Sequence, residues 1–276
     1  MSKPTLGIYQ FIRNGTKYDY PFIESLESAI PIADKIMICE CESEDDTLVR
    51  LEEFQAKYPD KVEIIHREWI KHYLELSGIA NYAATFLKTD WKWQLQSDEV
   101  LHEKDYDLIR DTLQNASPST TAIRVHYHHM LANFETEFNF CYENIIRIAR
   151  RNSGWSLMGD ACELGLGDHN NVVDSKIEVF HYGKVHNGEV GWTKEWDFQH
   201  LFTDIGFPDP KMKEMEEKLG QKFCDYVYLF ESNIKDKKVW RFEGTHPAIM
   251  TERIARFKGG GWEQFESRIK EGLKLL

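Results

Sequence analysis

The chain has 276 residues, and its 46 acidic against 34 basic residues give a formal net charge of −12 at pH 7. Hydrophobic residues make up 42% and aromatic residues 13% of the sequence. This is a globular composition, which excludes intrinsic disorder, a collagen-like fibre and a coiled coil. The acidic balance argues against a broad nucleic-acid interface and leaves a local one open.

The sequence carries no sign of a targeting or membrane segment. No apolar run approaches the roughly 20 residues that a transmembrane helix needs. Residues 1–5 lead directly into a short apolar stretch without the layout of a signal peptide. The five cysteines lack a zinc-ribbon spacing, and their odd number favours reduced thiols. These features predict a cytoplasmic protein with no transmembrane segment.

The first part of the chain alternates short apolar runs with amphipathic segments. Strands are predicted at residues 6–11, 35–39, 62–65 and 91–95. Helices are predicted between them, and Phe22, Leu26 and Ile30 illustrate the spacing of one buried helix face. Because the connections are short, this β-α-β order predicts an α/β fold with a mostly parallel sheet flanked by helices.

After residue 119 the pattern changes. Strands predicted at 122–127, 145–149 and 177–180 have few helices between them, which favours a mixed sheet or a hairpin region joined to the first layer. Helical periodicity returns from about Trp192. We therefore predict one α/β domain at residues 1–190 and a helical C-terminal extension at residues 191–276 that packs on it.

Polar segments follow three of the predicted strands. In an open parallel α/β sheet, ligands bind outside the carboxyl ends of the strands. Arg13 and Asn14 follow the first strand, residues 40–46 follow the second, and Asp98 and Glu99 follow the strand at 91–95. We expect these segments to meet at one edge of the sheet and to form a ligand site.

Asp98 and Glu99 are two adjacent carboxylates after an aromatic strand. Such a pair could bind a divalent cation through oxygen ligands. The cation would then bridge to phosphate oxygens and neutralise charge on a diphosphate leaving group. The alternative is that Asp98 only caps the helix that follows.

The order and spacing of these segments resemble a family 2-type glycosyltransferase of the GT-A fold over roughly residues 6–183. Residues 40–47 read ECESEDDT where that family has Asp-Asp-Gly-Ser-x-Asp-Gly-Thr. Residues 96–99 read QSDE where the family has Asp-x-Asp, often extended to Asp-x-Asp-Glu. Residues 180–183 read FHYG and resemble the family's His-Tyr-Gly element. The resemblance implies a Rossmann-like mixed sheet, with residues 1–190 as the nucleotide-sugar-binding and catalytic domain.

The resemblance also implies how the donor is bound. Glu40 matches the acidic residue that contacts the uracil or ribose, and Arg13 and Asn14 match the loop that borders the nucleotide. Further donor-side positions are Asp45, which could instead cap a helix, Asn81 and Gln96. Gln96 replaces the first aspartate of the metal motif. An amide can still bind a ribose hydroxyl, but the lost charge lowers the expected metal affinity.

Asp98 and His181 are the implied ligands of Mn²⁺ or Mg²⁺, and an imidazole suits Mn²⁺ better than Mg²⁺. The alternative for His181 is a partly buried, hydrogen-bonding histidine. Residues 159–163 lie where this group of enzymes places its catalytic base. Inverting transfer needs one carboxylate to take the proton of the acceptor hydroxyl. We favour Glu163 for this role, with Asp160 as second choice, and a solvated acidic loop is the alternative for both.

Two further clusters have plain alternatives. The histidines at 126, 128 and 129 could ligate a metal from one strand face, but no supporting Cys or His pattern accompanies them, so we favour a structural or acceptor-side role. The arginines at 147, 150 and 151 could meet a phosphate or could form a charged surface strand and turn.

The resemblance implies a metal-assisted hexosyltransferase that moves a sugar from a nucleotide-diphospho-sugar, UDP-linked, to an acceptor hydroxyl with inversion. The acceptor stays open among a glycan, a lipid-linked sugar, a protein side chain and a modified nucleobase. One alternative is a nucleotidyltransferase of the same fold, which should have a glycine-rich, basic loop where this chain has RNG at residues 13–15. Another is a non-catalytic nucleotide- or sugar-binding module, an alternative that the replacement at Gln96 keeps open.

Overall fold

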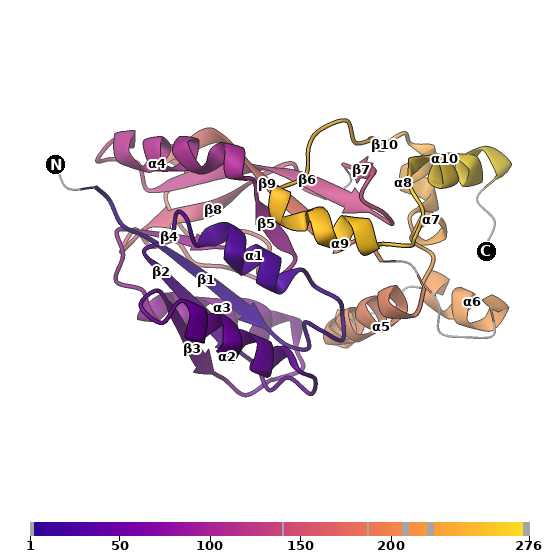
Figure 1. Ribbon diagram of the computed structural model, residues 1–276, viewed down its shortest axis with the longest axis horizontal. Helices are drawn as coiled ribbons and strands as arrows, with labels where there is room; N and C mark the ends of the chain where they lie inside the picture. The colour runs from indigo at the N-terminus through magenta and orange to yellow at the C-terminus, as the bar shows by residue number, and fades with distance from the viewer. Residues whose placement is uncertain (1–2, 140, 187, 206–209, 220–223, 273–276) are drawn as a thin grey trace.

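The structure, a computed structural model, describes residues 3–139, 141–186, 188–205, 210–219 and 224–272. Within these residues, ten strands form one mixed sheet flanked by helices (Figure 1). This arrangement confirms the predicted α/β class and the mixed sheet. The five cysteines, all of which lie in the described ranges, are free in the structure.

The strands are β1 (Leu6–Ile12), β2 (Lys35–Glu40), β3 (Val62–His66), β4 (Trp91–Gln94), β5 (Glu99–Leu101), β6 (Ala122–Leu131), β7 (Thr136–Phe138), β8 (Asn144–Arg150), β9 (Val172–Lys184) and β10 (Val239–Arg241). The seven strands that the sequence predicts are all present. The three that it does not predict, β5, β7 and β10, have three residues each. Segments this short give no usable hydrophobic period.

The helices of the first part are α1 (Phe22–Ala29), α2 (Thr47–Lys57), α3 (Tyr73–Phe86) and α4 (Tyr106–Asn115). Those of the second part are α5 (Gly188–Gln199), α6 (Pro210–Leu219), α7 (Tyr226–Leu229), α8 (Glu231–Lys235), α9 (Thr251–Arg256) and α10 (Trp262–Glu271). Among the described residues, no helix is both long enough and apolar enough to cross a membrane.

The sheet has a parallel half and a second half, called the antiparallel half, in which β6 and β9 form the one parallel pair among the described strands. Its strands follow the order β10-β7-β6-β8-β4-β1-β2-β3, and β9 joins by pairing with β5 and β6. β4, β1, β2 and β3 are parallel neighbours, so their carboxyl ends lie at one edge. β8 is antiparallel to β4 and thereby joins the two halves.

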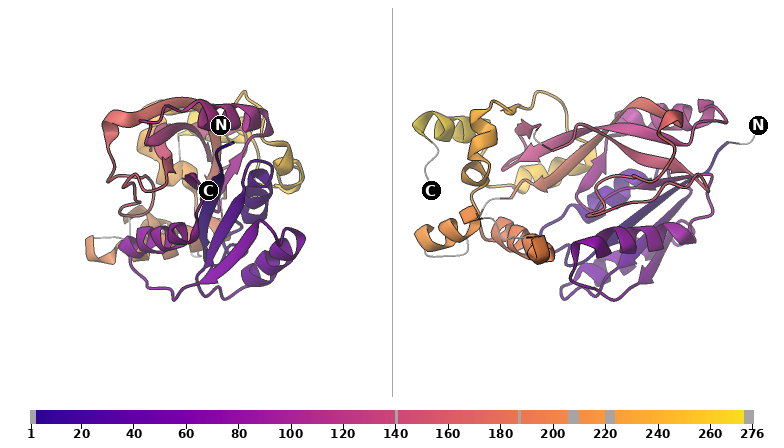
Figure 2. Two further views of the ribbon diagram at one scale, coloured as in Figure 1. Left: turned by 90° about the vertical axis from the view of Figure 1, so that its left-hand side faces the viewer. Right: turned by 180° about the vertical axis from the view of Figure 1, so that it is seen from behind.

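Alternating side chains divide the core of the parallel half. In β2, Ile36 and Ile38 pack in the cluster that contains α1 and α2, whereas Met37 and Cys39 pack in the cluster that contains α3. Figure 2 shows α3 on the opposite face of the strands from α1 and α2. The parallel strands are thus covered on both faces, and their continuous apolar sequences follow from this.

The C-terminal segment packs against the end of the antiparallel half. Trp192 of α5, Tyr226 of α7 and Phe265 of α10 share a core with Leu131 and Phe138. The segment also extends the sheet, because β10 pairs antiparallel with β7. The predicted boundary after residue 190 falls inside α5.

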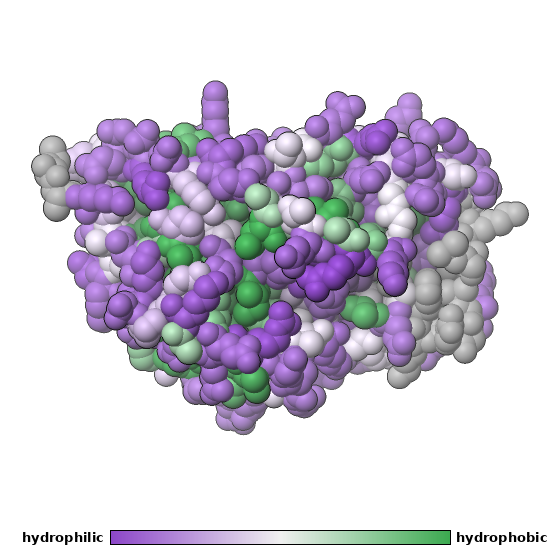
Figure 3. All heavy atoms as spheres, in the orientation of Figure 1, coloured by the Kyte–Doolittle hydropathy of each residue, from purple (hydrophilic) through white to green (hydrophobic). Residues whose placement is uncertain are grey.

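On the face in Figure 3, hydrophilic residues predominate and hydrophobic residues form small separate areas.

Candidate functional site

A cavity of about 570 Å³ lies at the carboxyl ends of β1 and β4. The loop after β1, the turn between β4 and β5, the end of β9 and helix α5 surround it. Of the predicted site residues, the cavity is lined by Arg13, Asn14, Gln96, Asp98, Asp160 and His181. The side chains of the other four predicted residues form hydrogen bonds with backbone groups and do not line the cavity. These residues are Glu40, Asp45, Asn81 and Glu163.

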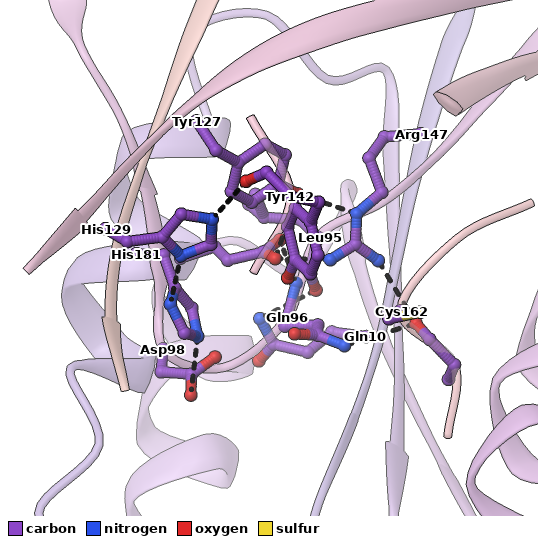
Figure 4. Close-up of polar contacts among 12 residues, drawn as sticks. Gln10, Leu95, Gln96, Asp98, Tyr127, His129, Tyr142, Arg147, Cys162 and His181 are labelled. Carbon is purple, nitrogen blue, oxygen red and sulfur yellow. Dashed lines mark hydrogen bonds and ion pairs between the residues drawn. The ribbon is translucent and has the colours of Figure 1, made fainter. Parts of the chain in front are cut away.

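Asp98 and His181 face each other on the wall of this cavity (Figure 4). His181 Nε2 lies 3.4 Å from Asp98 Oδ2. Strand pairing fixes their approach, because Glu99 in β5 is the antiparallel partner of His181 in β9. The N–H of Tyr182 also donates to the carbonyl oxygen of Asp98 at 2.9 Å. His181 therefore stands on a strand, and Asp98 lies in the turn directly before the strand that pairs with it.

The separation within this pair fits a shared divalent cation. Adjacent ligands of an octahedral ion, each about 2.1 Å from it, stand about 3 Å apart. A carboxylate oxygen with an imidazole nitrogen is a donor set that suits Mn²⁺. Within the described residues, no group of three or more His, Cys, Asp or Glu side chains is arranged to hold a metal. The remaining positions around such an ion would come from a ligand or from water.

Lys194 of α5 is a third charged group at this wall, and the sequence analysis missed it. Its Nζ lies 3.8 Å from Asp98 Oδ2 and donates to the carbonyl oxygen of Gly183. Burial alone would raise the pKa of Asp98, yet the contact with the His181 ring and the charge of Lys194 lower it well below its usual range. Asp98, His181 and Lys194 are called the strand wall from here on.

A buried ion pair supports the turn that carries Asp98. Arg147 Nη2 lies 2.5 Å from Glu99 Oε1, and both side chains are fully buried. The second carboxylate oxygen of Glu99 accepts the N–H of Gln96 at 2.8 Å. Arg147 also donates to the carbonyl oxygen of Ala161 at 3.2 Å. Arg147 is therefore a buried support of the turn and not part of a surface basic cluster.

The loops after β1 and β2, residues 13–18 and 40–47, form the opposite side and are called the loop wall. Glu40 Oε1 accepts the N–H of Ser43 at 2.6 Å, and Glu40 Oε2 lies 3.2 Å from His66 Nδ1. Asp45 accepts the N–H of Lys17 at 2.7 Å and the N–H at the start of α2 at 3.0 Å. Both carboxylates hold the loops in place instead of facing the cavity.

Arg13 and Asn14 belong to the loop wall and line the cavity. The Arg13 guanidinium lies 5.4 Å from the centre of the Trp69 ring and 2.8 Å from Glu44 Oε1. The Glu44 side chain is 72% exposed, so this ion pair is weak and open to exchange with a ligand. Asn14 adopts a left-handed backbone, with φ of 53°, and its Oδ1 accepts the N–H of Glu44 at 2.7 Å.

The remaining predicted residues lie around the loop at 152–165. Both ends of the Asn81 amide bond the backbone of Leu157, at 2.9 Å each, so Asn81 anchors this loop to α3. Glu163 accepts the N–H of Ile146 at 3.2 Å. Asp160 lies in the same loop and does line the cavity. Of the two predicted bases, the structure brings only Asp160 to the site.

No protein-family model matches this chain, and no curated protein matches it. The solved structures to which it is similar include glycosyltransferases. S. aureus TarS in complex with UDP is 11% identical, with a TM-score of 0.47 over 76% of this chain and 69% of that one. The mannosyltransferase PcManGT from Pyrobaculum calidifontis, in complex with GDP-Man and Mn²⁺, is 10% identical, with a TM-score of 0.47 over 99% and 80%.

Glucosyl-3-phosphoglycerate synthase from Mycobacterium tuberculosis, in complex with Mn²⁺, UDP and glucosyl-3-phosphoglycerate, is 15% identical. Its TM-score is 0.42 over 75% of this chain and 82% of that one. These are enzymes of the class that the sequence motifs predict. At such TM-scores the likeness is distant.

Proposed function

We propose that this chain transfers a sugar from a nucleotide-diphospho-sugar, UDP-linked, to an acceptor hydroxyl, assisted by Mn²⁺ or Mg²⁺. The observation that carries the proposal is the Asp98–His181 pair, 3.4 Å apart on the wall of a cavity at the carboxyl ends of parallel strands. These two residues would hold the ion. When bound, the ion neutralises the charge that develops on the diphosphate leaving group.

The basic residues of the cavity support a diphosphate ligand. Lys194 Nζ stands next to Asp98 and, in this proposal, stabilises the departing phosphate. The Arg13 guanidinium can donate two parallel hydrogen bonds to a phosphate once it leaves Glu44. Trp69 beside Arg13 offers a flat apolar surface for a nucleobase.

Asp160 is the base in this proposal. The acceptor oxygen forms a bond to the anomeric carbon while the bond from that carbon to the diphosphate oxygen breaks. The Asp160 carboxylate takes the proton of the acceptor hydroxyl in the same step. Direct displacement of this kind inverts the anomeric configuration. Asp160 is preferred over Glu163 because Asp160 lines the cavity, whereas Glu163 bonds the Ile146 backbone.

The test is release of nucleoside diphosphate from a panel of UDP- and GDP-sugars, with and without Mn²⁺, by the wild-type protein and by Asp98→Asn. We expect wild-type turnover that depends on the ion. We expect Asp98→Asn to lower turnover on the order of 10³-fold, since the metal contributes several kcal/mol. The melting temperature of the variant should stay nearly unchanged.

Three outcomes would contradict the proposal. A protein that binds UDP and turns over no donor would be a binding module. A protein that instead makes a nucleotide-sugar from UTP and a sugar 1-phosphate would be a nucleotidyltransferase. A large loss of stability in Asp98→Asn, with turnover intact, would mean that Asp98 only supports the turn.

A further inference from the structure

Behind His181 lies a second histidine, His129, that the proposed function does not use. β6 and β9 are parallel, and His129 and His181 are partners in their register. The two Nδ1 atoms lie 2.9 Å apart and the ring planes are at 79° (Figure 4). The predicted grouping of three histidines on one strand is therefore split: His128 stacks on Phe180, whereas His129 contacts His181.

The direction of the hydrogen bond between the two rings follows from the other contact of His129. Its Nε2 lies 2.7 Å from the carbonyl oxygen of Tyr142. A carbonyl oxygen only accepts hydrogen bonds, so Nε2 of His129 carries a hydrogen. In a neutral ring, Nδ1 then has a lone pair. The hydrogen in the contact between the rings must therefore come from Nδ1 of His181.

The surroundings of His129 favour the neutral ring. The side chain is buried, with 2% of its surface exposed. Its two ring nitrogens contact a carbonyl oxygen and another imidazole, and neither contact supplies the negative charge that would stabilise a protonated ring. A second proton on this ring would leave a buried charge without a carboxylate partner in these contacts.

With its hydrogen on Nδ1, a neutral His181 directs the lone pair of Nε2 toward Asp98 Oδ2, 3.4 Å away. Two such atoms attract a cation between them. We propose that His129 is a positioning residue, which accepts the Nδ1–H of His181 and so selects the tautomer whose Nε2 can bind the divalent ion. Outer hydrogen-bond partners of metal-binding histidines commonly work in this way. The inference rests on the proposed function for the role of the ion, but not for the tautomer itself.

The first test reads the tautomer directly and requires neither metal nor substrate. In protein labelled with ¹⁵N-histidine, the signals of His181 are assigned by their loss in His181→Gln. We expect a protonated Nδ1 and an unprotonated Nε2 for neutral His181 in the wild-type protein. A His181 that carries its hydrogen on Nε2 would overturn the proposal.

The second test uses two substitutions of His129 and titrates Mn²⁺ alone, followed by electron paramagnetic resonance. His129→Leu removes both ring nitrogens, and we expect its affinity for Mn²⁺ to fall about 10- to 100-fold. His129→Gln can still accept from His181 through its oxygen and donate to the Tyr142 carbonyl through its NH₂ group. We expect this variant to keep the wild-type tautomer and an affinity close to that of the wild type.

Wild-type affinity in a folded His129→Leu would overturn the role of His129. If His129→Leu does not fold, an altered His181 tautomer in His129→Gln together with unchanged Mn²⁺ affinity would overturn it equally. Asp98→Asn separates this failure from failure of the proposed function. Should Asp98→Asn bind Mn²⁺ like the wild type, the metal site itself would be wrong, and the tautomer measurement would still decide which nitrogen of His181 is protonated.

Discussion

The two walls of the cavity use their charged side chains differently. On the loop wall, the carboxylates of Glu40 and Asp45 accept hydrogen bonds from backbone N–H groups of the loops. On the strand wall, Asp98, His181 and Lys194 face one another, with oxygen-to-nitrogen distances of 3.4 and 3.8 Å. Carboxylates that accept hydrogen bonds from backbone N–H groups stabilise the conformation of the loops. Charged groups that contact one another on a cavity wall can exchange these contacts for contacts with a ligand.

Asp160 lines the cavity and Glu163 does not, and this difference gives the largest expected effect among the variants below. Asp160→Asn should lower kcat about 10²- to 10⁴-fold with little change in donor binding, because it removes the base. Glu163→Gln is the matched control and should stay within a few-fold of wild-type kcat. Turnover is measured as release of nucleoside diphosphate in the presence of acceptor. The reverse pattern would return the base to Glu163 and break the comparison.

Loss of the positively charged Lys194 side chain from the strand wall should have the next largest effect. Lys194→Met should lower kcat about 10²-fold, which is typical for the loss of one group that stabilises charge in a transition state. The loss should appear mainly in kcat, since the charge develops as the phosphate leaves. Lys176→Gln, an exposed position on β9, is the control. Equal kcat in the two variants would remove Lys194 from the proposed chemistry.

A pH series can measure how the lowered pKa of buried His186, near the strand wall, contributes to stability. Burial and the neighbouring Lys194 lower the pKa of His186 to about 4. Between that value and about 6.5, the unfolded state binds a proton that the folded state does not, so stability falls as the pH falls through this window. The full effect of this one group is about 3 kcal/mol.

Urea unfolding of wild type and His186→Gln from pH 4 to 7.5 measures this contribution. The variant should lose part of the pH dependence, and wild type should lose more stability on acidification. Parallel curves would show that His186 is protonated in the folded state near its ordinary pKa.

The loop wall should respond in stability rather than in activity. Glu40→Gln leaves one of the hydrogen bonds of the loop unmade and should lower the free energy of unfolding by about 2 kcal/mol. The kcat of the folded variant should remain near wild type. Glu52→Gln, on the exposed face of α2, is the control for the loss of charge. A Glu40→Gln protein of full stability that no longer binds the donor would show that Glu40 acts on the nucleotide.

The parallel half of the fold could be predicted because its strands are buried on both faces. Ile36, Met37, Ile38 and Cys39 form a continuous apolar run, and the helices between the strands have clear periods. The strand β5 could not be predicted, because three residues between two loops carry no period. Yet β5 pairs with β9 and so aligns Asp98 with His181. From the sequence, this pair could be proposed only through the motifs of a known family.

The direction of side chains was the other part that the sequence could not supply. Glu40 lies at the predicted place, but the backbone N–H of Ser43 occupies its carboxylate. Lys194 lies in a helix that no motif covers, and only packing of α5 against the end of β9 brings it near Asp98. The sequence therefore predicted which loops meet at the cavity more reliably than which side chains face it.

The central claim is that Asp98 and His181 together hold a divalent ion at the cavity. The most direct measurement is a crystal structure of the protein with Mn²⁺ and UDP, in which anomalous scattering locates the metal. We predict a manganese peak about 2.2 Å from both Asp98 Oδ2 and His181 Nε2, with the diphosphate on the same ion. An Asp98 side chain turned away from the metal, with the nucleotide bound outside the cavity, would contradict the account.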